Sequence, residues 1–167
     1  MKSFYEKLKD KDEEAFNKLY DDYVKLIYHI AYSYTRSKED AEDITNEVFL
    51  KILNSIENYN DKGKFKEWIC AIARNTACNY VTRIKDENSL TDEESVNNAK
   101  SSNDGHQDMI DLFEEFLDEV TVRIMILRFI YDYKFKEISL TLDMTIGQVQ
   151  GLYYDGIEKL RKVCKNG

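Results

Sequence analysis

Large apolar side chains recur at steps of three and four residues through the first part of the chain, which is the spacing of amphipathic helices. A helix is expected over 13–35, and a second one after Ser37, whose hydroxyl suits the cap position before an acidic first turn. The first apolar stripe consists of Phe16, Leu19, Tyr20, Tyr23, Ile27, Ile30, Ala31 and Tyr34. The second consists of Ile44, Val48, Phe49, Ile52, Leu53 and Ile56.

A polar cluster at 58–63, Asn-Tyr-Asn-Asp-Lys-Gly, predicts a turn after the second helix. A third helix should follow, with an apolar side formed by Phe65, Trp68, Ile69, Ile72, Ala73, Thr76 and Tyr80. The chain has no proline and only six glycines, so helix breakers are rare. The pattern therefore predicts an all-α protein.

The composition changes abruptly after Lys85. Residues 86–107 are rich in Asp, Glu, Asn and Ser and hold almost no large apolar side chain. Such a segment cannot bury enough surface to offset its ordering entropy. We therefore expect a flexible acidic linker at 86–107 between two small helical domains, 1–85 and 108–167.

The second domain predicts a helix-turn-helix. The apolar positions Leu112, Phe113, Phe116, Leu117 and Val120 indicate one helix, and Val122, Met125, Ile126, Phe129 and Ile130 a second stretch. A short helix from about Phe135 to Leu142, a turn at 143–145 and a last helix complete the motif. Thr145 and Gln148 have the spacing of a capping box at the start of the last helix. Two glycines, Gly151 and Gly156, should weaken that helix.

The net charge of -8 argues against a free-standing nucleic-acid binder. The charge is uneven, however, because residues 61–85 carry six basic and two acidic side chains and so have a net charge of +4. No apolar run approaches a membrane span, and the first residues lack a signal-peptide core, so we expect a cytoplasmic protein without membrane insertion. The three cysteines are too few and too scattered for a disulfide framework.

Catalytic motifs are missing from the sequence. His29 and His106 are far apart, and there is no Gly-rich phosphate loop, paired metal motif or nucleophile elbow. We therefore expect no enzyme activity, no cofactor and no metal.

Two segments of the chain carry a specific resemblance. DAEDITNEVFLK at 40–51, FKEWICAIARN at 65–75 and a trailing Arg83 resemble region two of the extracytoplasmic-function (ECF) bacterial sigma factors. Residues 109–163, with the helix-turn-helix and a closing KLRK, resemble region four. The resemblance implies two helical lobes that bind core RNA polymerase and promoter DNA.

By the same resemblance, the helix after Ser37 docks on the clamp helices of the polymerase's largest subunit. Its core-binding residues would be Asp43, Asn46, Glu47 and Leu50. Acidic side chains beside apolar ones suit a basic coiled coil, although a charge run is also typical of a solvated face. Asn46 stands where the family usually has the longer Gln.

The basic stretch is expected to contact the −10 promoter element, where the family melts DNA and captures a flipped base. Cations can neutralise phosphates, and a pocket must offset unstacking. The loop at 58–64 and one helix face with Arg74, Asn75 and Arg83 are the candidates, so the predicted residues are Asn60, Lys62, Lys64, Arg74, Asn75 and Arg83. Phe65 and Trp68 fit the apolar stripe and are expected in the core.

The last helix is expected to contact the −35 element through Thr145, Gln148, Gln150, Tyr154 and Lys159. Gln side chains can pair with adenine, and a helix N-terminus can bind phosphate. The family usually carries Lys and Arg early in this helix, whereas this chain has none before Lys159.

This departure leaves three alternatives for the second lobe: weak DNA contact, DNA contact supported by polymerase, or a protein partner. The main alternative for the whole chain is a polymerase-binding regulator or decoy that selects no promoter, and a pure protein-interaction module is a third. The resemblance also implies an anti-sigma factor as a partner.

Overall fold

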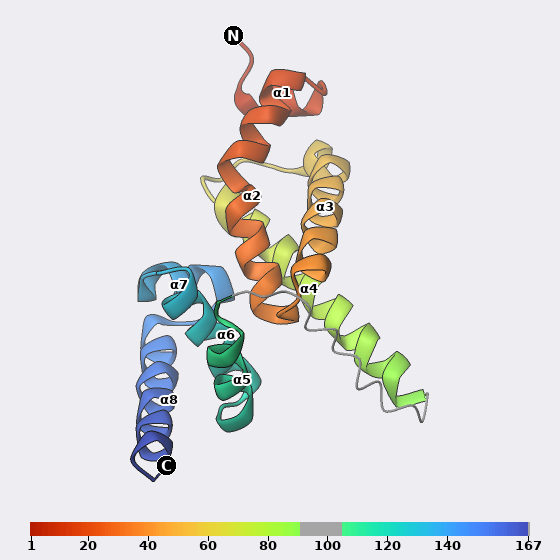
Figure 1. Cartoon of the computed structure of the whole chain (residues 1–167). Coiled ribbons are helices and arrows are strands. Elements are labelled where there is room, and N and C mark those ends of the chain that lie inside the picture. Colours follow the sequence, from red (N-terminus) through yellow and green to blue (C-terminus); the bar gives the residue numbers. More distant parts are fainter. Residues whose placement is uncertain (91–104, 167) are drawn as a thin grey trace. The chain divides into compact units, whose positions relative to one another are not determined.

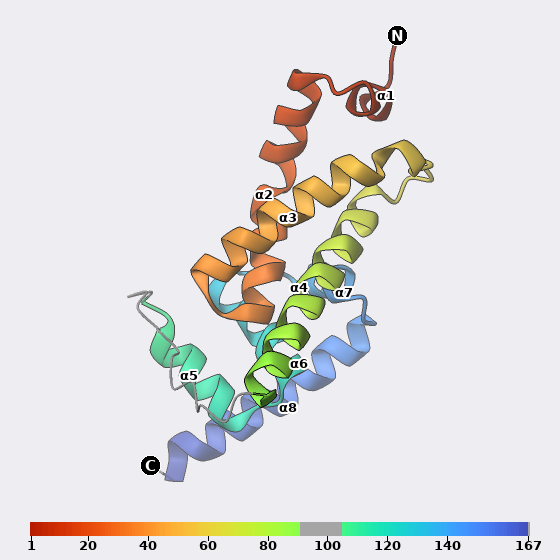
Figure 2. The same ribbon diagram turned by 90° about the vertical axis from the view of Figure 1, so that its right-hand side faces the viewer.

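We describe the protein from a computed structural model that defines residues 1–90 and 105–166. Every element in these two ranges is a helix, so the all-α prediction is confirmed (Figure 1, Figure 2). The chain divides into two compact units, Met1–Glu94 and Ser95–Gly167, each with its own core.

Unit 1 is built on three long helices that pack on one another: α2 (Glu13–Thr35), α3 (Lys38–Ser55) and α4 (Phe65–Leu90). Figures 1 and 2 show them side by side, with the short α1 (Phe4–Lys9) at the N-terminal end of α2. A 3-10 turn, η1 (Ile56–Asn58), follows α3. The fully buried centre comprises Leu19, Ile27, Ile30, Ile44, Val48, Ile52, Ile69 and Ala73.

Side-chain caps fix where these helices begin. The Ser37 hydroxyl accepts a hydrogen bond from the Asp40 N–H at 3.3 Å, which confirms the predicted start of α3. The Asp12 carboxylate accepts from the Ala15 N–H at 2.9 Å and starts α2. In the predicted stripe of α2, Leu19, Ile27, Ile30 and Ala31 are buried, three aromatic side chains are partly buried, and Tyr20 is 42% exposed.

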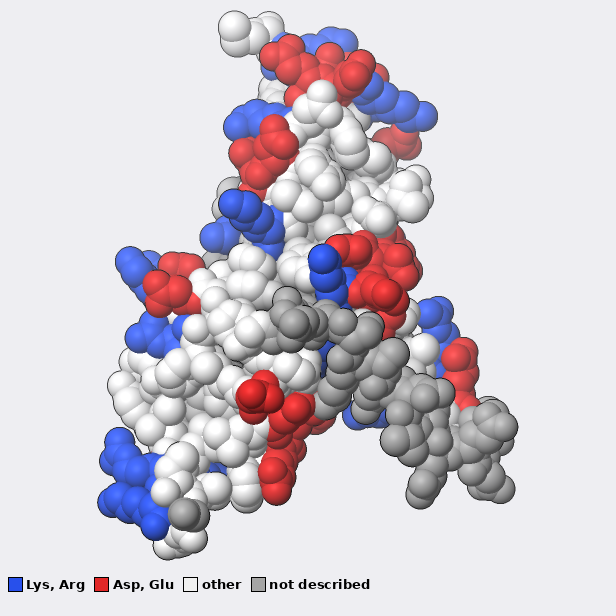
Figure 3. Space-filling model, viewed as in Figure 1, with Lys and Arg blue, Asp and Glu red and all other residues white. Residues whose placement is uncertain are grey.

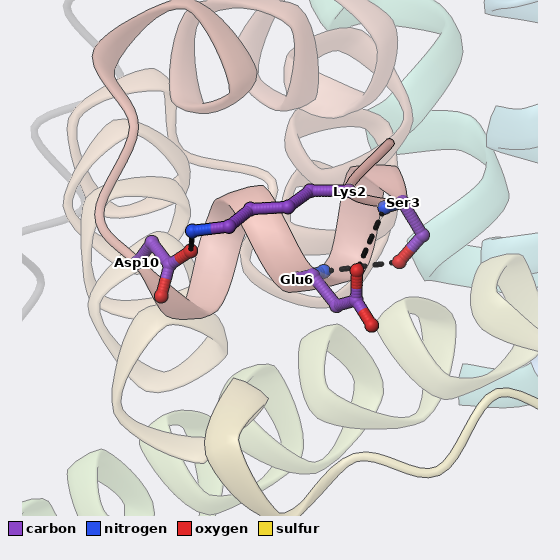
Figure 4. Close-up of polar contacts among 4 residues, drawn as sticks. All are labelled: Lys2, Ser3, Glu6 and Asp10. Atoms are coloured by element: carbon purple, nitrogen blue, oxygen red, sulfur yellow. Dashed lines mark hydrogen bonds and ion pairs between the residues drawn. The ribbon is translucent and has the colours of Figure 1, made fainter.

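The N-terminal helix α1 was not predicted by the apolar spacing, because it is only six residues long. A capping box forms it: the Glu6 N–H donates to the Ser3 hydroxyl at 3.2 Å, and the Ser3 N–H donates to the Glu6 carboxylate at 2.9 Å (Figure 4). An ion pair of 2.6 Å joins Lys2 to Asp10 across the helix (Figure 4).

An aromatic cluster closes the end of unit 1 where α4 begins. Phe65 is buried, and its ring lies 5.3 Å from Tyr59, 5.1 Å from Tyr5 and 5.7 Å from Trp68. Trp68 is partly buried and also packs on Tyr59, at 4.7 Å between ring centroids. Both side chains therefore pack with the core, as predicted.

The helix α4 continues through 86–90, the first part of the range predicted to be linker. Residues 91–104 of that predicted linker lie outside the described residues, and its last residue, Gln107, begins α5. The proposed domain limits at 85 and 108 thus stay a prediction.

Unit 2 comprises α5 (Gln107–Phe116), α6 (Glu119–Met125), a π-helical turn η2 (Ile126–Ile130), α7 (Phe135–Leu142) and α8 (Ile146–Asn166). The helix predicted to reach Val120 ends at Phe116 instead, because Asp118 caps a new helix by accepting from the Thr121 N–H at 2.8 Å. The predicted limits of α7 are confirmed.

A close approach between α6 and α8 requires a glycine. Gly156 is buried, and a Cβ added there would lie 2.5 Å from the Met125 Cε and 2.9 Å from the Thr121 Cγ2. A Cβ added at Gly151 would meet open space. Gly156 therefore lowers the helix propensity of α8 but allows α6 to pack closely against it, whereas Gly151 has no such packing role.

Two further sequence-based expectations concern membranes and cysteines. Among the described helices, none is long and apolar enough to cross a membrane. The three cysteines are free; Cys70 is buried and Cys78 and Cys164 are exposed. Burial raises the pKa of the Cys70 thiol to about 11.

Candidate functional site

The four predicted polymerase-binding residues share one side of α3. Asp43, Asn46, Glu47 and Leu50 follow one another at steps of three, one and three residues, and all four are exposed. The opposite side of the helix, including Ile44, Val48 and Ile52, is fully buried. Leu50 is 62% exposed, so a large apolar side chain lies on the same outer side as the two carboxylates. Asp and Glu side chains gather over α3 in the surface view (Figure 3).

Polar contacts with α4 hold this acidic helix in place. The Tyr80 hydroxyl donates to the Asp40 carboxylate at 2.6 Å, and burial of the phenol, with a smaller contribution from this bond, raises the pKa of Tyr80 to about 12. The Lys51 ammonium donates to the Thr76 hydroxyl of α4 at 3.1 Å. Within α3, Lys51 also pairs with Glu47 at 3.3 Å. The α3 surface is therefore presented by a helix that is anchored along its length.

The loop before α4 exposes Asn60, Lys62 and Lys64. Its shape is set locally, because the Asp61 carboxylate accepts from the Gly63 N–H at 2.9 Å and from the Tyr59 hydroxyl at 3.4 Å. Gly63 has a φ of 74°, in the left-handed region that favours glycine. The loop thus holds two cations beside the start of α4.

The three predicted DNA-binding residues of α4 do not share one face, contrary to the expectation of a single face. Arg74 and Arg83 are nine residues apart, about two and a half turns, and so point to opposite sides of the helix. Asn75 lies between them on the exposed side, and Arg74 is partly buried. The Arg83 guanidinium lies 5.4 Å from the centre of the Tyr80 ring.

The start of α8 has the predicted capping box. The Gln148 N–H donates to the Thr145 hydroxyl at 3.1 Å, and the Thr145 N–H donates to the Gln148 side-chain oxygen at 3.0 Å. Two of the predicted −35 groups therefore already serve the helix. Gln150, Tyr154 and Lys159 are exposed, and Tyr154 is 59% exposed.

Positive charge on α8 is confined to its second half. Glu158 is followed by Lys159, Arg161, Lys162 and Lys165, and Lys and Arg side chains gather over this end in the surface view (Figure 3). The N-terminal half offers amides, a phenol and backbone N–H groups instead.

The structure brings the predicted residues together in three groups: the α3 face, the loop with α4, and the exposed side of α8. The first two belong to unit 1 and the third to unit 2. Sequence reasoning missed the contribution of Asp40 and Tyr80, because two residues 40 positions apart leave no local signal of their hydrogen bond. In the two described ranges, no group of three or more His, Cys, Asp or Glu side chains could hold a metal.

Comparison with known proteins gives matches over most of the chain. The family model described as Sigma-70 region 2 matches residues 19–86, which span most of α2, all of α3 and most of α4. The Bacillus subtilis RNA polymerase sigma factor SigV is 31% identical over 143 residues, covering 84% of this chain and 85% of SigV. The ECF sigma factor SigX of the same organism is 26% identical over 171 residues, covering 90% and 84% of the two chains.

A solved structure of CnrH in complex with the cytosolic domain of CnrY is similar in fold. It matches with a TM-score of 0.67 and 15% sequence identity, and the match covers 98% of this chain and 96% of CnrH.

The chain therefore belongs to the bacterial RNA polymerase sigma factors. Within them it is a member of the ECF group, whose members bind RNA polymerase for transcription initiation. Nothing in these comparisons favours the alternative of a polymerase-binding decoy.

Proposed function

We propose that this sigma factor docks on core polymerase through the exposed face of α3, formed by Asp43, Asn46, Glu47 and Leu50. The observation that supports it best is the separation of roles on this helix, whose inner side carries the core while its outer side exposes two carboxylates, an amide and a leucine. Such a surface suits a partner helix with cationic and apolar side chains, because charge complementarity steers encounter and the leucine adds apolar contact.

The −10 element is proposed to meet the loop with Asn60, Lys62 and Lys64 and the exposed side of α4. The loop cations can neutralise phosphates of a melted strand, and Asn75 can pair with the edge of an unstacked base. Because Arg74 and Arg83 point to opposite sides of α4, we propose that they contact different parts of the DNA and do not line one pocket.

The −35 element is proposed to meet the N-terminal half of α8. Gln150, Tyr154 and the helix N-terminus can contact bases and phosphates without a formal charge. Since this half lacks cations, the affinity of unit 2 for free DNA should be low, and polymerase would hold it at the promoter.

Regulation by a protein partner is the remaining part of the proposal. CnrH, which is similar in fold, was solved with the cytosolic domain of CnrY bound. We propose that an anti-sigma factor binds this chain as well. The chain would act in the cytoplasm as a regulatory subunit, and polymerase would supply the catalysis.

Alanine at both Arg74 and Asn75 tests the DNA-binding assignment. In run-off transcription with core polymerase, the double variant should yield no transcript while its affinity for core stays unchanged. The matched control is Asn17→Ala with Lys25→Ala, which removes one amide and one cation from exposed positions on α2. Unchanged transcription by the Arg74 and Asn75 variant, with its helical content intact, would remove both residues from the DNA site.

A further inference from the structure

The exposed stripe of α3 does not end at Leu50. Continuing the same helical steps from Leu50 leads to Leu53 and Asn54, and then to Glu57 in the 3-10 turn. All three line a groove of about 440 Å³ between α1, the start of α2 and the end of α3. Leu50 lines it too, so the proposed polymerase-binding face runs without a break into this groove.

The walls of the groove are largely apolar. Leu8 and Ile56 are each only 2% exposed and belong to the core, whereas Leu50 at 62% faces solvent at the junction with the acidic face. Phe16 and Leu53 complete the apolar lining. A concave surface of this size and composition is typical of a site that binds an apolar group.

Charges on the lining have mixed signs. Lys9 and Lys11 come from the α1 side, and Asp12, Glu13 and Glu57 come from the helices on either side. The Asp12 carboxylate already caps α2. Mixed charge favours no polyanion or polycation, so the apolar walls decide what the groove accepts. This contrasts with the acidic face at Asp43 and Glu47.

The wall formed by α1 is held firmly. Its capping box and the Lys2–Asp10 ion pair stabilise the helix itself (Figure 4). The Lys9 ammonium also donates a hydrogen bond to the Tyr59 carbonyl at 3.3 Å. Leu8 anchors it in the core. The groove is therefore present before any partner binds, which lowers the entropic cost of filling it.

We propose that this groove receives a large apolar side chain from the same polymerase helix that contacts the acidic face of α3. The proposal rests on the proposed function of that face. Asp43 and Asn54 are eleven residues apart, about 16 Å along the axis of α3. A partner helix lying along the stripe would thus offer cations to Asp43 and Glu47 and, about three turns away, an apolar side chain to the groove.

Photo-crosslinking of the full chain on core polymerase tests this placement. Benzoylphenylalanine is introduced singly at Asp43, at Asn54 and at Lys25, which is exposed on α2 and serves as control. Positions 43 and 54 should crosslink to the same polymerase subunit, and position 25 should not.

The outcomes separate the two proposals. A crosslink from position 43 without one from position 54 would overturn the groove proposal but not the proposal that the α3 face binds polymerase. If neither position crosslinks although the chain binds core, both are wrong. A crosslink from 54 to a second copy of this chain would also overturn the groove proposal.

A filling substitution gives a second measurement. Leu53→Trp keeps the wall apolar but occupies the groove, so affinity for core should fall about tenfold while the helical content is unchanged. Val120→Trp, an equally conservative enlargement at an exposed position in unit 2, should leave affinity unchanged. Wild-type affinity of Leu53→Trp would contradict the proposal.

Discussion

In units 1 and 2, the residues proposed to bind partners differ in how much they also stabilise the fold. In unit 1 the candidate polymerase residues lie on the outer side of α3, and the core residues of that helix lie on its inner side. In unit 2 the same side chains serve both purposes, because Thr145 and Gln148, which are predicted to contact DNA, also form the cap that starts α8. Substitutions should therefore separate binding from folding in unit 1 and couple them in unit 2.

The largest effect that separates the units is expected at Gly156. Gly156→Val places a branched side chain against Met125 and Thr121, so unit 2 should lose about 2–3 kcal/mol of stability. Hydrogen exchange on the full chain measures this unit by unit: amides of α6 to α8 should lose protection, and those of α2 to α4 should keep it. Native protection in α8 would mean that the α6–α8 contact is looser than described.

Charge reversal on α3 gives the complementary result in unit 1. Asp43→Arg together with Glu47→Arg should weaken binding to core at least tenfold, equivalent to about 1.4 kcal/mol, because like charges would meet the partner's cations. The melting temperature should fall only slightly, since both side chains are exposed and the Glu47–Lys51 pair that is lost is a surface ion pair. Glu14→Arg with Asp21→Arg on α2 is the matched control, and an equal loss of affinity there would show that only net charge matters.

In unit 1, the hydrogen bond between Tyr80 and Asp40 joins the acidic helix α3 to α4, so a substitution there should change stability. Tyr80→Phe should cost about 1 kcal/mol of stability near neutral pH, which denaturant unfolding can measure. Between pH 10 and about 12 the unfolded chain releases the phenol proton before the folded chain does, so this contribution to stability falls as pH rises. Phe should remove that part of the pH dependence, and an identical alkaline profile would contradict the bond.

The smallest effect has the opposite sign. Gly151→Ala meets open space on the exposed side of α8 and gains helix propensity, so unit 2 should become about 0.5–1 kcal/mol more stable. Denaturant unfolding of the full chain measures the gain. A loss of stability would show that Gly151, like Gly156, is needed for packing.

Local patterns in the sequence predicted much of this architecture. Helical spacing gave the limits of α2 and α7, and single polar residues gave the caps at Ser37 and Thr145, because each signal lies within one turn of the feature it specifies. The break between Phe116 and Glu119 was not predicted, because apolar residues continue across it and only the cap formed by Asp118 marks the start of the new helix.

What the sequence could not supply are contacts between distant segments. The role of Gly156 depends on Met125 and Thr121 in another helix, and propensity alone counted this glycine as a weakness. The groove beside Leu53 needs α1, whose six residues are too few for a periodic pattern. By contrast, the spread of Arg74 and Arg83 around α4 needed only their spacing of nine residues and helical geometry, so it could have been derived from the sequence.

Genome-wide run-off transcription tests the central claim most directly. It combines the purified chain, core polymerase and genomic DNA of the source organism. A promoter-selecting sigma factor should give discrete start sites that share upstream elements. Replacing Gln150 by alanine should change the sequence preferred in the −35 element of those promoters. Stable binding to core without any specific transcript would contradict the account.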